Sequence, residues 1–289
     1  LLQLEKQAQA RMRFTASNTN AASSREAQPA KLSQAKGLAL TAWCGILVFL
    51  GFALPILLML KPLLVSDMLI PWGRFFEWSF NSLRLGAITA FLAVGFSLLI
   101  AFSLRSQADF FARFISQLVG LGYAIPGAVV VVGLLLPVSW IQKQWPDSPV
   151  GFWITASVLG LIWAYLVRFC AVALQSIQSG YARIPTSLDD SARTLGVTGM
   201  ALLSSVHAPL LKRSVFAAAL LVFVDVMKEL PATLVLRPFD TDTLAVVAFQ
   251  LARDERLGEA ALPSLALVAV GLIPVLLLSR AMRQTNKPA

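Results

Sequence analysis

Long apolar runs alternate with shorter polar segments along most of the chain. Six of these runs each offer about 20 predominantly apolar residues, which is the number that a helix needs to cross a bilayer core of roughly 30 Å. The pattern therefore predicts an all-α polytopic membrane protein with six transmembrane helices. The predicted spans are residues 38–60, 85–104, 115–136, 152–174, 215–236 and 261–278.

The composition supports a lipid environment. Of the 289 residues, 57% are hydrophobic and 13% are charged, and the mean hydropathy is +0.73. Ordinary soluble domains are about a quarter charged. A soluble fold of this size still exposes much of its surface and needs charged residues to solvate it, so the composition excludes a single soluble globule.

The basic residues indicate orientation. The net charge is +9, which in a soluble protein would suggest a nucleic-acid partner. Here the basic residues lie mostly between apolar runs, and most of them, including Arg105, Arg168 and Arg183, fall on one side of the six predicted spans. Basic loops favour the cytoplasm, so both termini are predicted to be cytoplasmic, with no nucleic-acid partner. Tryptophans gather at the opposite ends of the spans, at Trp72, Trp78, Trp140, Trp145 and Trp153.

The polar segments at the two ends define the domain limits. Residues 1–14 fit a basic amphipathic helix on the inner membrane surface, and residues 15–36 have the Ser, Ala, Asn and Gln content of a linker. We therefore expect residues 1–36 to be a cytoplasmic segment. Residues 37–283 form the six-span transmembrane domain, and residues 284–289 form a cytoplasmic tail.

The sequence offers little for catalysis. It contains no G-x-x-x-x-G-K-[ST] phosphate loop, and its one histidine, His207, excludes a histidine-based metal cluster or triad. Cys44 and Cys170 lie inside apolar runs and are interpreted as buried hydrophobic residues. Asp225 and Glu229 fall on one predicted helix, whereas an intramembrane aspartyl protease needs carboxylates from two helices. We predict no enzymatic activity, no resident cofactor and no catalytic residue.

The segment 180–213, between the fourth and fifth predicted spans, has a definite local pattern. Ser187 fits a helix N-cap, and Asp190 three residues later completes a capping box. Gly196 fits a C-terminal helix stop, and a second helix is expected over residues 198–206. A compact helix-Gly-helix on the inner face suits partner docking, and an ordinary capped loop helix is the alternative.

The same segment carries a recognisable signature. The letters DSA at residues 190–192, then Gly196, then VHAP at residues 206–209 follow the spacing E-A-A-x-x-x-G-x9-I-x-L-P. The chain thus resembles the permeases of type I ABC importers, with Asp190 standing where that family has Glu. The resemblance implies that the short helix is a coupling helix seated in a cytoplasmic ATPase. The coupling positions are Ser187, Asp190, Ala192, Gly196, Val206 and Pro209.

Three ionisable residues interrupt the fifth predicted span. Asp225, Lys228 and Glu229 have the i, i+3, i+4 spacing that places them on one helix face, and Pro231 removes a backbone hydrogen bond just after them. Each charge inside a membrane helix costs a few kcal/mol on insertion scales. We interpret these four residues as lining the translocation pathway or an interface with a second membrane half. An internally satisfied packing cluster is the alternative.

A further resemblance, to the ferric-iron branch of these permeases, covers residues 38–283. It implies a bacterial inner-membrane protein that moves Fe(III) delivered by a periplasmic binding protein. ATP and Mg²⁺ would be bound by a partner ATPase dimer. Because such permeases are commonly two fused halves, the polar start of the chain predicts a C-terminal half beside a second six-span half. The resembling segments are residues 81–84, 123–127, 225–238, 239–244 and 250–256.

Several alternatives stay open. The acids at the predicted outer side could attract Fe(III), a hard cation that prefers oxygen ligands, or could dock a basic lobe of a binding protein. The substrate could instead be a phosphonate, thiamine or a polyamine. An ion-coupled secondary transporter or channel would use Asp225 and Glu229 as coupling carboxylates, and an intramembrane enzyme or scaffold is more distant. The outer acids are Asp240, Asp242, Asp254, Glu255 and Glu259.

Overall fold

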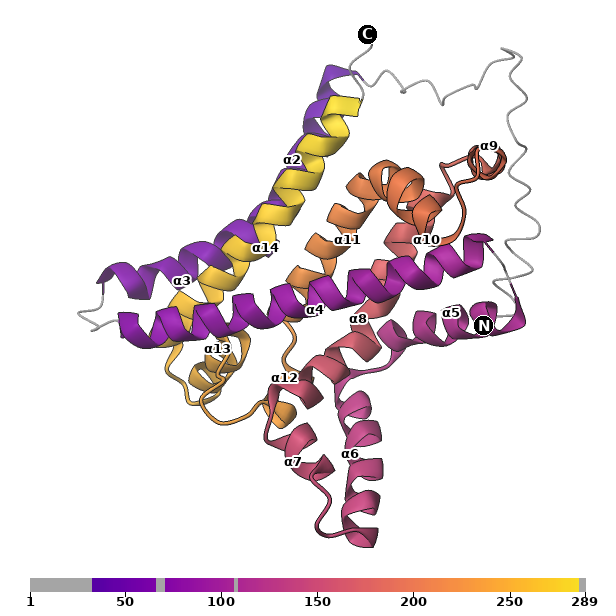
Figure 1. Ribbon diagram of the computed structural model, residues 1–289. Helices are drawn as coiled ribbons and strands as arrows, with labels where there is room; N and C mark the ends of the chain where they lie inside the picture. The colour runs from indigo at the N-terminus through magenta and orange to yellow at the C-terminus, as the bar shows by residue number, and fades with distance from the viewer. Residues whose placement is uncertain (1–32, 66–70, 107–108, 286–289) are drawn as a thin grey trace. The chain divides into compact units, whose positions relative to one another are not determined.

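The computed structural model of the protein describes residues 33–65, 71–106 and 109–285 (Figure 1). Within these residues every regular element is helical, which confirms the predicted all-α class. The chain divides into two units, Leu1–Leu54 and Pro55–Ala289. The predicted amphipathic segment, and the predicted linker as far as residue 32, lie outside the described residues.

The first described helices match the first predicted span. Helix α2 (Gln34–Val48) is followed by a π-helical turn, η1 (Phe49–Ala53), and then by α3 (Leu54–Val65). The run from Gln34 to Leu64 is long and apolar enough to cross a membrane. The helix begins slightly earlier than the residue 38 predicted for the first span.

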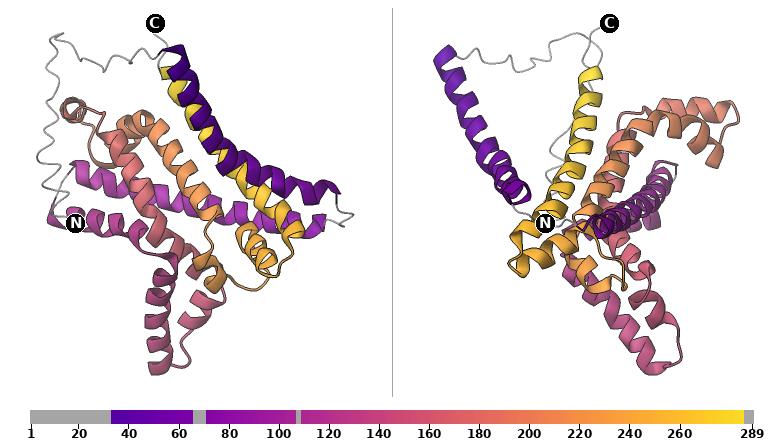
Figure 2. Two further views of the ribbon diagram at one scale, coloured as in Figure 1. Left: turned by 180° about the vertical axis from the view of Figure 1, so that it is seen from behind. Right: turned by 90° about the vertical axis from the view of Figure 1, so that its left-hand side faces the viewer.

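Three long helices form the core of the second unit. They are α4 (Trp72–Ser106), α8 (Val158–Tyr181) and α11 (Ala208–Met227), and they pack against one another (Figures 1 and 2). Ala93, Ala164 and Ala218, one from each helix, are completely buried. Small residues at such contacts let helix backbones approach closely, which is how helices associate when lipid replaces water.

Five helices of the described residues are long and apolar enough to span a membrane. Four correspond to the first, second, fourth and sixth predicted spans, and α6 (Gly127–Gln144) covers part of the third. The fifth predicted span is absent from this set. Its helix, α11, carries three charged residues, Lys212, Arg213 and Asp225, and these are too many for a membrane-spanning helix recognised by length and composition. The chain is thus a multi-pass membrane protein, and the number of six spans stays a prediction.

The third predicted span, 115–136, is not one continuous helix. Helix α5 (Phe110–Leu121) ends there, a 3-10 turn η2 (Gly122–Ala124) follows, and α6 begins at Gly127. The interruption has a local cause, because Pro126 disfavours helical geometry in the residue before it. Ile125 accordingly adopts an extended ψ of 126°.

The fourth predicted span, 152–174, is also divided. A short helix α7 (Val150–Thr155) ends before Ser157, whose hydroxyl accepts a hydrogen bond from the backbone N–H of Leu159 and caps α8. Helix α8 then continues to Tyr181, seven residues beyond the predicted end. The predicted span therefore lies closer to the N-terminus than the helix itself.

Three further helices complete the second unit: α12 (Pro231–Leu236), α13 (Leu244–Arg253) and α14 (Leu257–Thr285). Helix α13 was not predicted as an element. Its start is fixed from two sides, because Thr243 Oγ1 accepts from the N–H of Val246, and the N–H of Leu244 donates to Ser82 Oγ of α4 at 2.9 Å.

The segment between α8 and α11 contains α9 (Thr186–Thr194), α10 (Gly199–Leu202) and a π-helical turn, η3 (Leu203–His207). These elements lie at the opposite end of α8 from α6 and α7 (Figures 1 and 2). A helix of 24 residues spans about 36 Å, so α8 separates the two ends by more than the thickness of a bilayer core.

Gly122 is the tightest backbone contact of the interrupted span, and it generates a prediction. A Cβ atom at Gly122 would lie 1.9 Å from the carbonyl oxygen of Val167, whereas a Cβ atom at Gly120 would meet nothing within 4 Å. We expect Gly122→Ala to destabilise the protein by about 1–3 kcal/mol, as overpacking does. Gly120→Ala is the matched control and should be neutral or stabilising. Thermal unfolding in detergent measures both, and equal midpoints would contradict the described contact.

Candidate functional site

Two buried polar clusters occupy the second unit. The first, the Glu229 cluster, joins Glu229 to Arg168, Gly127, Thr233 and Tyr165. The second, the Asp189 cluster, joins Asp189 to Arg105, His207 and Tyr181. Buried charges are expensive unless they are paired and hydrogen-bonded, so both clusters are candidates for a functional role.

Glu229 lies in the gap between α11 and α12 and forms an ion pair with Arg168 of α8. The two side chains are 7% and 17% exposed. The second carboxylate oxygen accepts a hydrogen bond of 3.3 Å from the backbone N–H of Ala232. Glu229 therefore pairs with a basic side chain and also caps the positive end of α12.

Hydroxyl groups extend this cluster into the core. Thr233 Oγ1 donates to the carbonyl oxygen of Glu229 at 2.6 Å, and the Tyr165 hydroxyl lies 2.6 Å from Thr233 Oγ1. Helix α6 begins against the same group, because a Cβ atom at Gly127 would lie 2.5 Å from Glu229 Oε1. Only glycine fits there without displacing the carboxylate, so both helix interruptions meet at this ion pair.

The predicted charged face of the fifth span is wrong in one respect. Asp225 and Lys228 pair as expected, with 2.8 Å between Oδ1 and Nζ, but Glu229 lies beyond the end of α11 at Met227. Pro231 explains the end of the helix, since its ring has no N–H to donate to Met227 and collides with that carbonyl. Released from the helix, Glu229 turns to Arg168 instead of lying one turn above Asp225.

Arg168 is a second correction. The charge count assigned it to the cytoplasmic loop after the fourth span, but it lies within α8, which continues to Tyr181. Its side chain is 17% exposed and pairs with Glu229 inside the protein, so it is no guide to orientation. The predicted span of residues 152–174 already includes Arg168, so the sequence itself places this charge within a helix and not in the loop after it.

The Asp189 cluster gathers around one carboxylate. Asp189 is 5% exposed. Its Oδ2 accepts from Arg105 Nε at 2.8 Å, and its Oδ1 accepts from Arg105 Nη2 at 3.4 Å and lies 3.1 Å from His207 Nε2. Arg105 Nη2 also donates to the carbonyl oxygen of Ile184 at 3.0 Å. Such forked, charge-assisted bonds are stronger and more directional than neutral ones.

The tautomer of His207 follows from its neighbours. A carboxylate can only accept, so Nε2 donates to Asp189, and in the neutral ring Nδ1 then accepts from the Tyr181 hydroxyl at 3.2 Å. The ring of His207 is completely buried and packs edge-on against Tyr181 at 5.2 Å. Every polar atom of this histidine side chain is thereby satisfied.

The electrostatics of Asp189 have a definite sign. Burial raises the pKa of the Asp189 carboxyl, but hydrogen bonds and charges from Arg105 and His207 lower it by more, so its pKa lies below the usual value. A lowered folded-state pKa stabilises the fold fully above the ordinary aspartate pKa of about 3.9. This contribution is lost as pH falls through the folded-state pKa, so the cluster is intact at neutral pH.

The start of α9 corrects the predicted capping box. The helix begins at Thr186, and Pro185 occupies the N-cap without a side-chain hydrogen bond. Ser187 is already inside the first turn, because the extended ψ of Pro185 lets the next residue enter the helix. Asp190 is exposed and forms a loose ion pair of 3.8 Å with Arg193. The buried carboxylate is its neighbour Asp189, which lies just outside the signature of residues 190–209.

The end of α9 confirms the predicted stop at Gly196. Its φ is +82°, and the N–H groups of Gly196 and Val197 donate to the carbonyl oxygens of Arg193 and Ala192. This pair of bonds is the Schellman arrangement, which requires a left-handed residue. Ala192 is buried on the same face as Asp189.

The second half of the segment runs further than predicted. The helix expected over 198–206 starts as α10, widens into η3 and joins α11 without a stop. Val206 is half-buried in η3, and Pro209 is exposed in the first turn of α11. The widened π-helical turn ends at His207, so it sets the direction of the imidazole toward Asp189.

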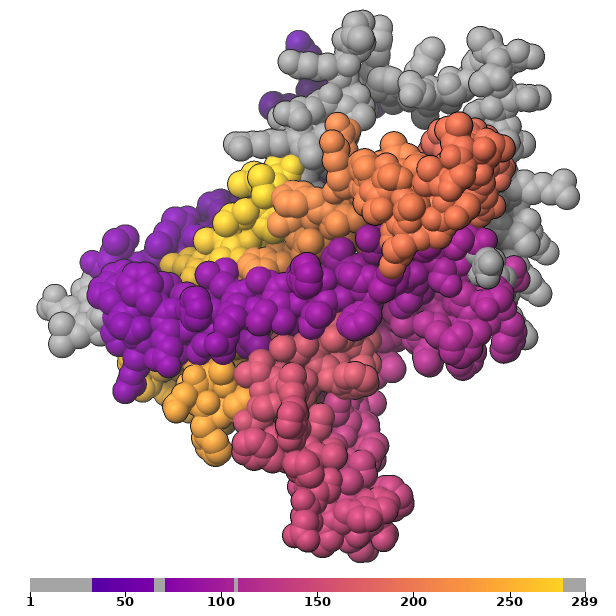
Figure 3. All heavy atoms as spheres, viewed as in Figure 1, coloured from indigo at the N-terminus to yellow at the C-terminus, as the bar shows by residue number. Residues whose placement is uncertain are grey.

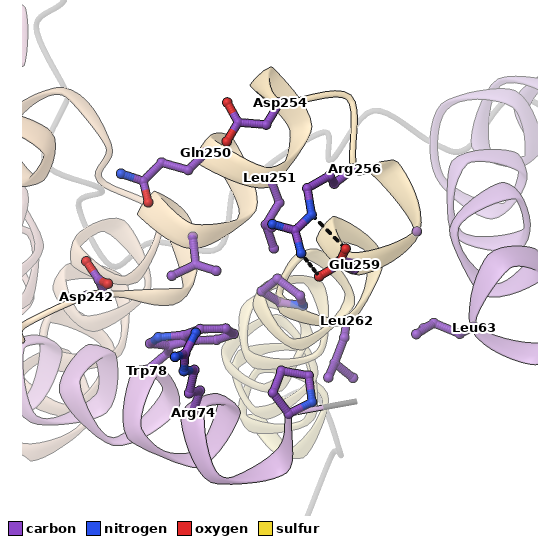
Figure 4. A pocket seen from close by; sticks show the side chains of 14 residues that line it. Leu63, Arg74, Trp78, Asp242, Gln250, Leu251, Asp254, Arg256, Glu259 and Leu262 are labelled. Atoms are coloured by element: carbon purple, nitrogen blue, oxygen red, sulfur yellow. Dashed lines mark hydrogen bonds and ion pairs between the residues drawn. The ribbon is translucent and has the colours of Figure 1, made fainter. Parts of the chain in front are cut away.

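A pocket of about 290 Å³ lies near the start of α4 (Figure 4). Its wall carries both signs of charge, and Arg256 forms a two-pronged ion pair with Glu259 at 2.7 and 2.5 Å. Arg74 and Trp78 of α4 lie side by side on one wall. Three of the predicted outer acids therefore line one pocket together with basic residues, namely Asp242, Asp254 and Glu259.

Within the described residues, no group of three or more His, Cys, Asp or Glu side chains could hold a metal ion. No family model matches the chain.

The curated proteins to which the chain is similar include permease proteins of several transport systems. The chain is 25% identical over 234 residues, 80% of its length, to the "Fe(3+)-transport system permease protein FbpB 2" of Haemophilus influenzae, and it spans only 44% of that relative. It is 27% identical over 71% of its length to the "Putative 2-aminoethylphosphonate transport system permease protein PhnV" of Salmonella typhimurium, spanning 74% of it. A "Molybdate/tungstate transport system permease protein WtpB" of Methanocaldococcus jannaschii is 23% identical over 66% of the chain and 75% of its own length.

Solved structures agree on the fold. A chain of a bacterial alginate ABC transporter, in complex with an alginate pentasaccharide-bound periplasmic protein, matches with a TM-score of 0.61 and 15% identity. The match covers 87% of this chain and 96% of that chain. The protein thus shares the fold of this ABC transporter chain, and its homologues are permease proteins of transport systems, which confirms the resemblance at this level.

The buried pair of the Glu229 cluster generates a prediction. Glu229→Gln leaves the Arg168 charge unpaired, which costs about 3–5 kcal/mol when a buried pair is broken. Asp225→Asn is the matched control, since its partner Lys228 is 63% exposed and exposed pairs contribute about 0–1 kcal/mol. Thermal unfolding in detergent should show a large loss for the first variant and little for the second. The double variant Arg168→Gln/Glu229→Gln should lose less than the two single variants combined, and strict additivity would contradict the pairing.

Proposed function

We propose that the chain is one membrane-spanning half of an ATP-driven importer, in which α9 docks on a cytoplasmic ATPase dimer and a periplasmic binding protein delivers a small solute. The observation that carries the proposal is α9 itself. It is a short helix with an exposed outer side, and one buried carboxylate, Asp189, holds it to the ends of the core helices. Figure 3 shows this segment at the molecular surface.

The exposed side of α9 and the turn after it suits a protein partner. Leu188, Leu195 and Met200 are 42%, 82% and 62% exposed. They stand beside the exposed charges of Asp190 and Arg193. Apolar side chains surrounded by polar ones are typical of a docking surface.

ATP and Mg²⁺ would be bound by the partner, because the sequence contains no phosphate loop. The energy of hydrolysis would then enter this chain as movement of α9. Two copies of such a half are needed to enclose a pathway. A second six-span half, in the same or a separate chain, is supported by the first relative, of which this chain spans 44%. We also propose that α9 and both termini are cytoplasmic, in a bacterial inner membrane.

For the pathway we propose the interrupted fifth span, with Asp225, Lys228, Glu229 and Pro231. The helix break beside paired charges supports this assignment, because non-helical backbone at membrane depth is tolerated only inside protein or beside a water-filled cavity. An ion-coupled transporter is supported less well. Its coupling carboxylates would have to bind and release a cation, and Asp225 and Glu229 are both already ion-paired.

Coupling through α9 is tested at Gly196. A β-branched residue is strongly disfavoured at a φ of +82°, whereas Asn tolerates that region. No atom lies within 4 Å of a Cβ added there, so the backbone alone decides the outcome. We expect Gly196→Val to lose most ATP-dependent uptake while inserting normally, and Gly196→Asn to keep it. Solute uptake into right-side-out membrane vesicles measures both variants, and inverted vesicles are the orientation control. Normal uptake by Gly196→Val would contradict the coupling role.

For the substrate we propose Fe(III). Support comes from the iron-transport relative. The three outer acids in the pocket add none, because each is already paired with an arginine. The other relatives are named for oxyanion or phosphonate transport, which makes the choice testable.

Proteoliposomes that contain the complete transporter and its binding protein should take up radiolabelled Fe(III) only with ATP. Excess 2-aminoethylphosphonate or molybdate should leave that uptake unchanged. Uptake of either anion without iron uptake would contradict the substrate assignment and leave the permease assignment standing.

A further inference from the structure

We propose that Asp189 is a positioning residue that makes α9 move as one body with the ends of α4, α8 and α11, so that its hydrogen bonds carry the coupling movement. This inference deepens the proposed function and rests on it. It concerns the inner face of α9, which an ATPase bound to the outer face would not touch.

The first step is that one carboxylate reaches all three core helices. Arg105 is in the last turn of α4, His207 directly precedes α11, and Tyr181 is the last residue of α8. Asp189 binds Arg105 and His207 directly, and it reaches Tyr181 through the imidazole. Arg105 adds a second tie, to the carbonyl oxygen of Ile184 in the turn between α8 and α9.

The second step is that these bonds resist sliding. Apolar contact is non-directional, so a helix held only by Ala192 and Ile184 could shift over its neighbours. A forked guanidinium-carboxylate pair fixes distance and angle together. The side chains of Arg105 and Asp189 are 14% and 6% exposed, so water competes little for their hydrogen bonds.

The third step is that the local backbone is shaped around this contact. The π-helical turn η3 ends at His207, and such turns within helices are uncommon and frequently occur at functional sites. The Schellman stop at Gly196 ends α9 at Thr194, which leaves Asp189 near the middle of a helix of nine residues. Force applied to the outer side of α9 therefore passes into the core through directional bonds at Asp189.

The test measures rigidity and coupling separately in the complete membrane-embedded protein. Hydrogen exchange of the α9 amides reports whether the helix is held. For Asp189→Asn we expect protection of α9 to fall by about tenfold, while protection of α4 and α8 stays unchanged. Asp190→Asn is the matched control for exchange, because it removes the same charge from the exposed side of the same helix. Its α9 protection should remain at the unsubstituted level.

The second readout is the number of Fe(III) ions, or of whichever solute is transported, moved per ATP hydrolysed. For Asp189→Asn we expect this ratio to fall by about tenfold with the ATPase still bound. Asp189→Glu keeps the charge and should recover part of the ratio. Arg105→Lys keeps the charge but loses the fork, so it should lie between the unsubstituted protein and Asp189→Asn. It also serves as the test variant if Asp189→Asn does not accumulate.

The outcomes separate the two claims. Unchanged α9 protection in both Asp189→Asn and Arg105→Lys would overturn the positioning role, and so would lost protection with an unchanged transport ratio. Failure of the unsubstituted protein to bind any ATPase would instead overturn the proposed function. Hydrogen exchange would in that case still decide whether Asp189 holds α9 to the core.

Discussion

The ion pair between Arg168 and Glu229 lies where two interrupted helices meet. One interruption separates α5 from α6, and the other separates α11 from α12. In lipid, every backbone polar group must find a partner within the protein, so such gaps are tolerated only where they are buried in protein or line a water-filled cavity. Helix α8 supports both gaps, because η2 packs on its backbone at Val167, and Arg168 pairs with Glu229. Helix α8 also contacts α4, α5, α7 and α11, so it is the element on which much of the second unit packs.

The same helix connects the two polar clusters. Arg168 lies in the middle of α8 and Tyr181 at its end, so one continuous helix carries a residue of the Glu229 cluster and a residue of the Asp189 cluster. Displacement of α9 would reach α8 through Asp189, His207 and Tyr181. Helix α8 would then carry it to the gap before α12. Two buried carboxylates, each with an arginine partner, thus provide a physical route between the proposed docking helix α9 and the proposed pathway.

The sequence predicted the fold class and several local features from strong, local signals. Apolar length predicted the first, second, fourth and sixth spans, and the conformational freedom of glycine predicted the stop at Gly196. Pro231 also indicated the interruption before α12. The gap at Ile125 was missed, because hydropathy averages over about 20 residues and does not register one proline. Arg168 and Asp189 were missed for another reason. Their roles depend on partners 61 and 84 residues away, and no local pattern encodes such pairs. Helix periodicity placed Asp189 on the face of Ala192, and this was the available signal.

The central claim is that the outer side of α9 contacts a cytoplasmic ATPase. Its most direct measurement is photo-cross-linking in native membranes, with benzoylphenylalanine in place of Leu195, which is 82% exposed at the end of α9. Phe91 of α4 is 80% exposed and provides the comparison site on a membrane helix. The account predicts a cross-link from position 195 to a nucleotide-binding subunit and none from position 91. An absence of that product at position 195, with the protein correctly inserted, would contradict it.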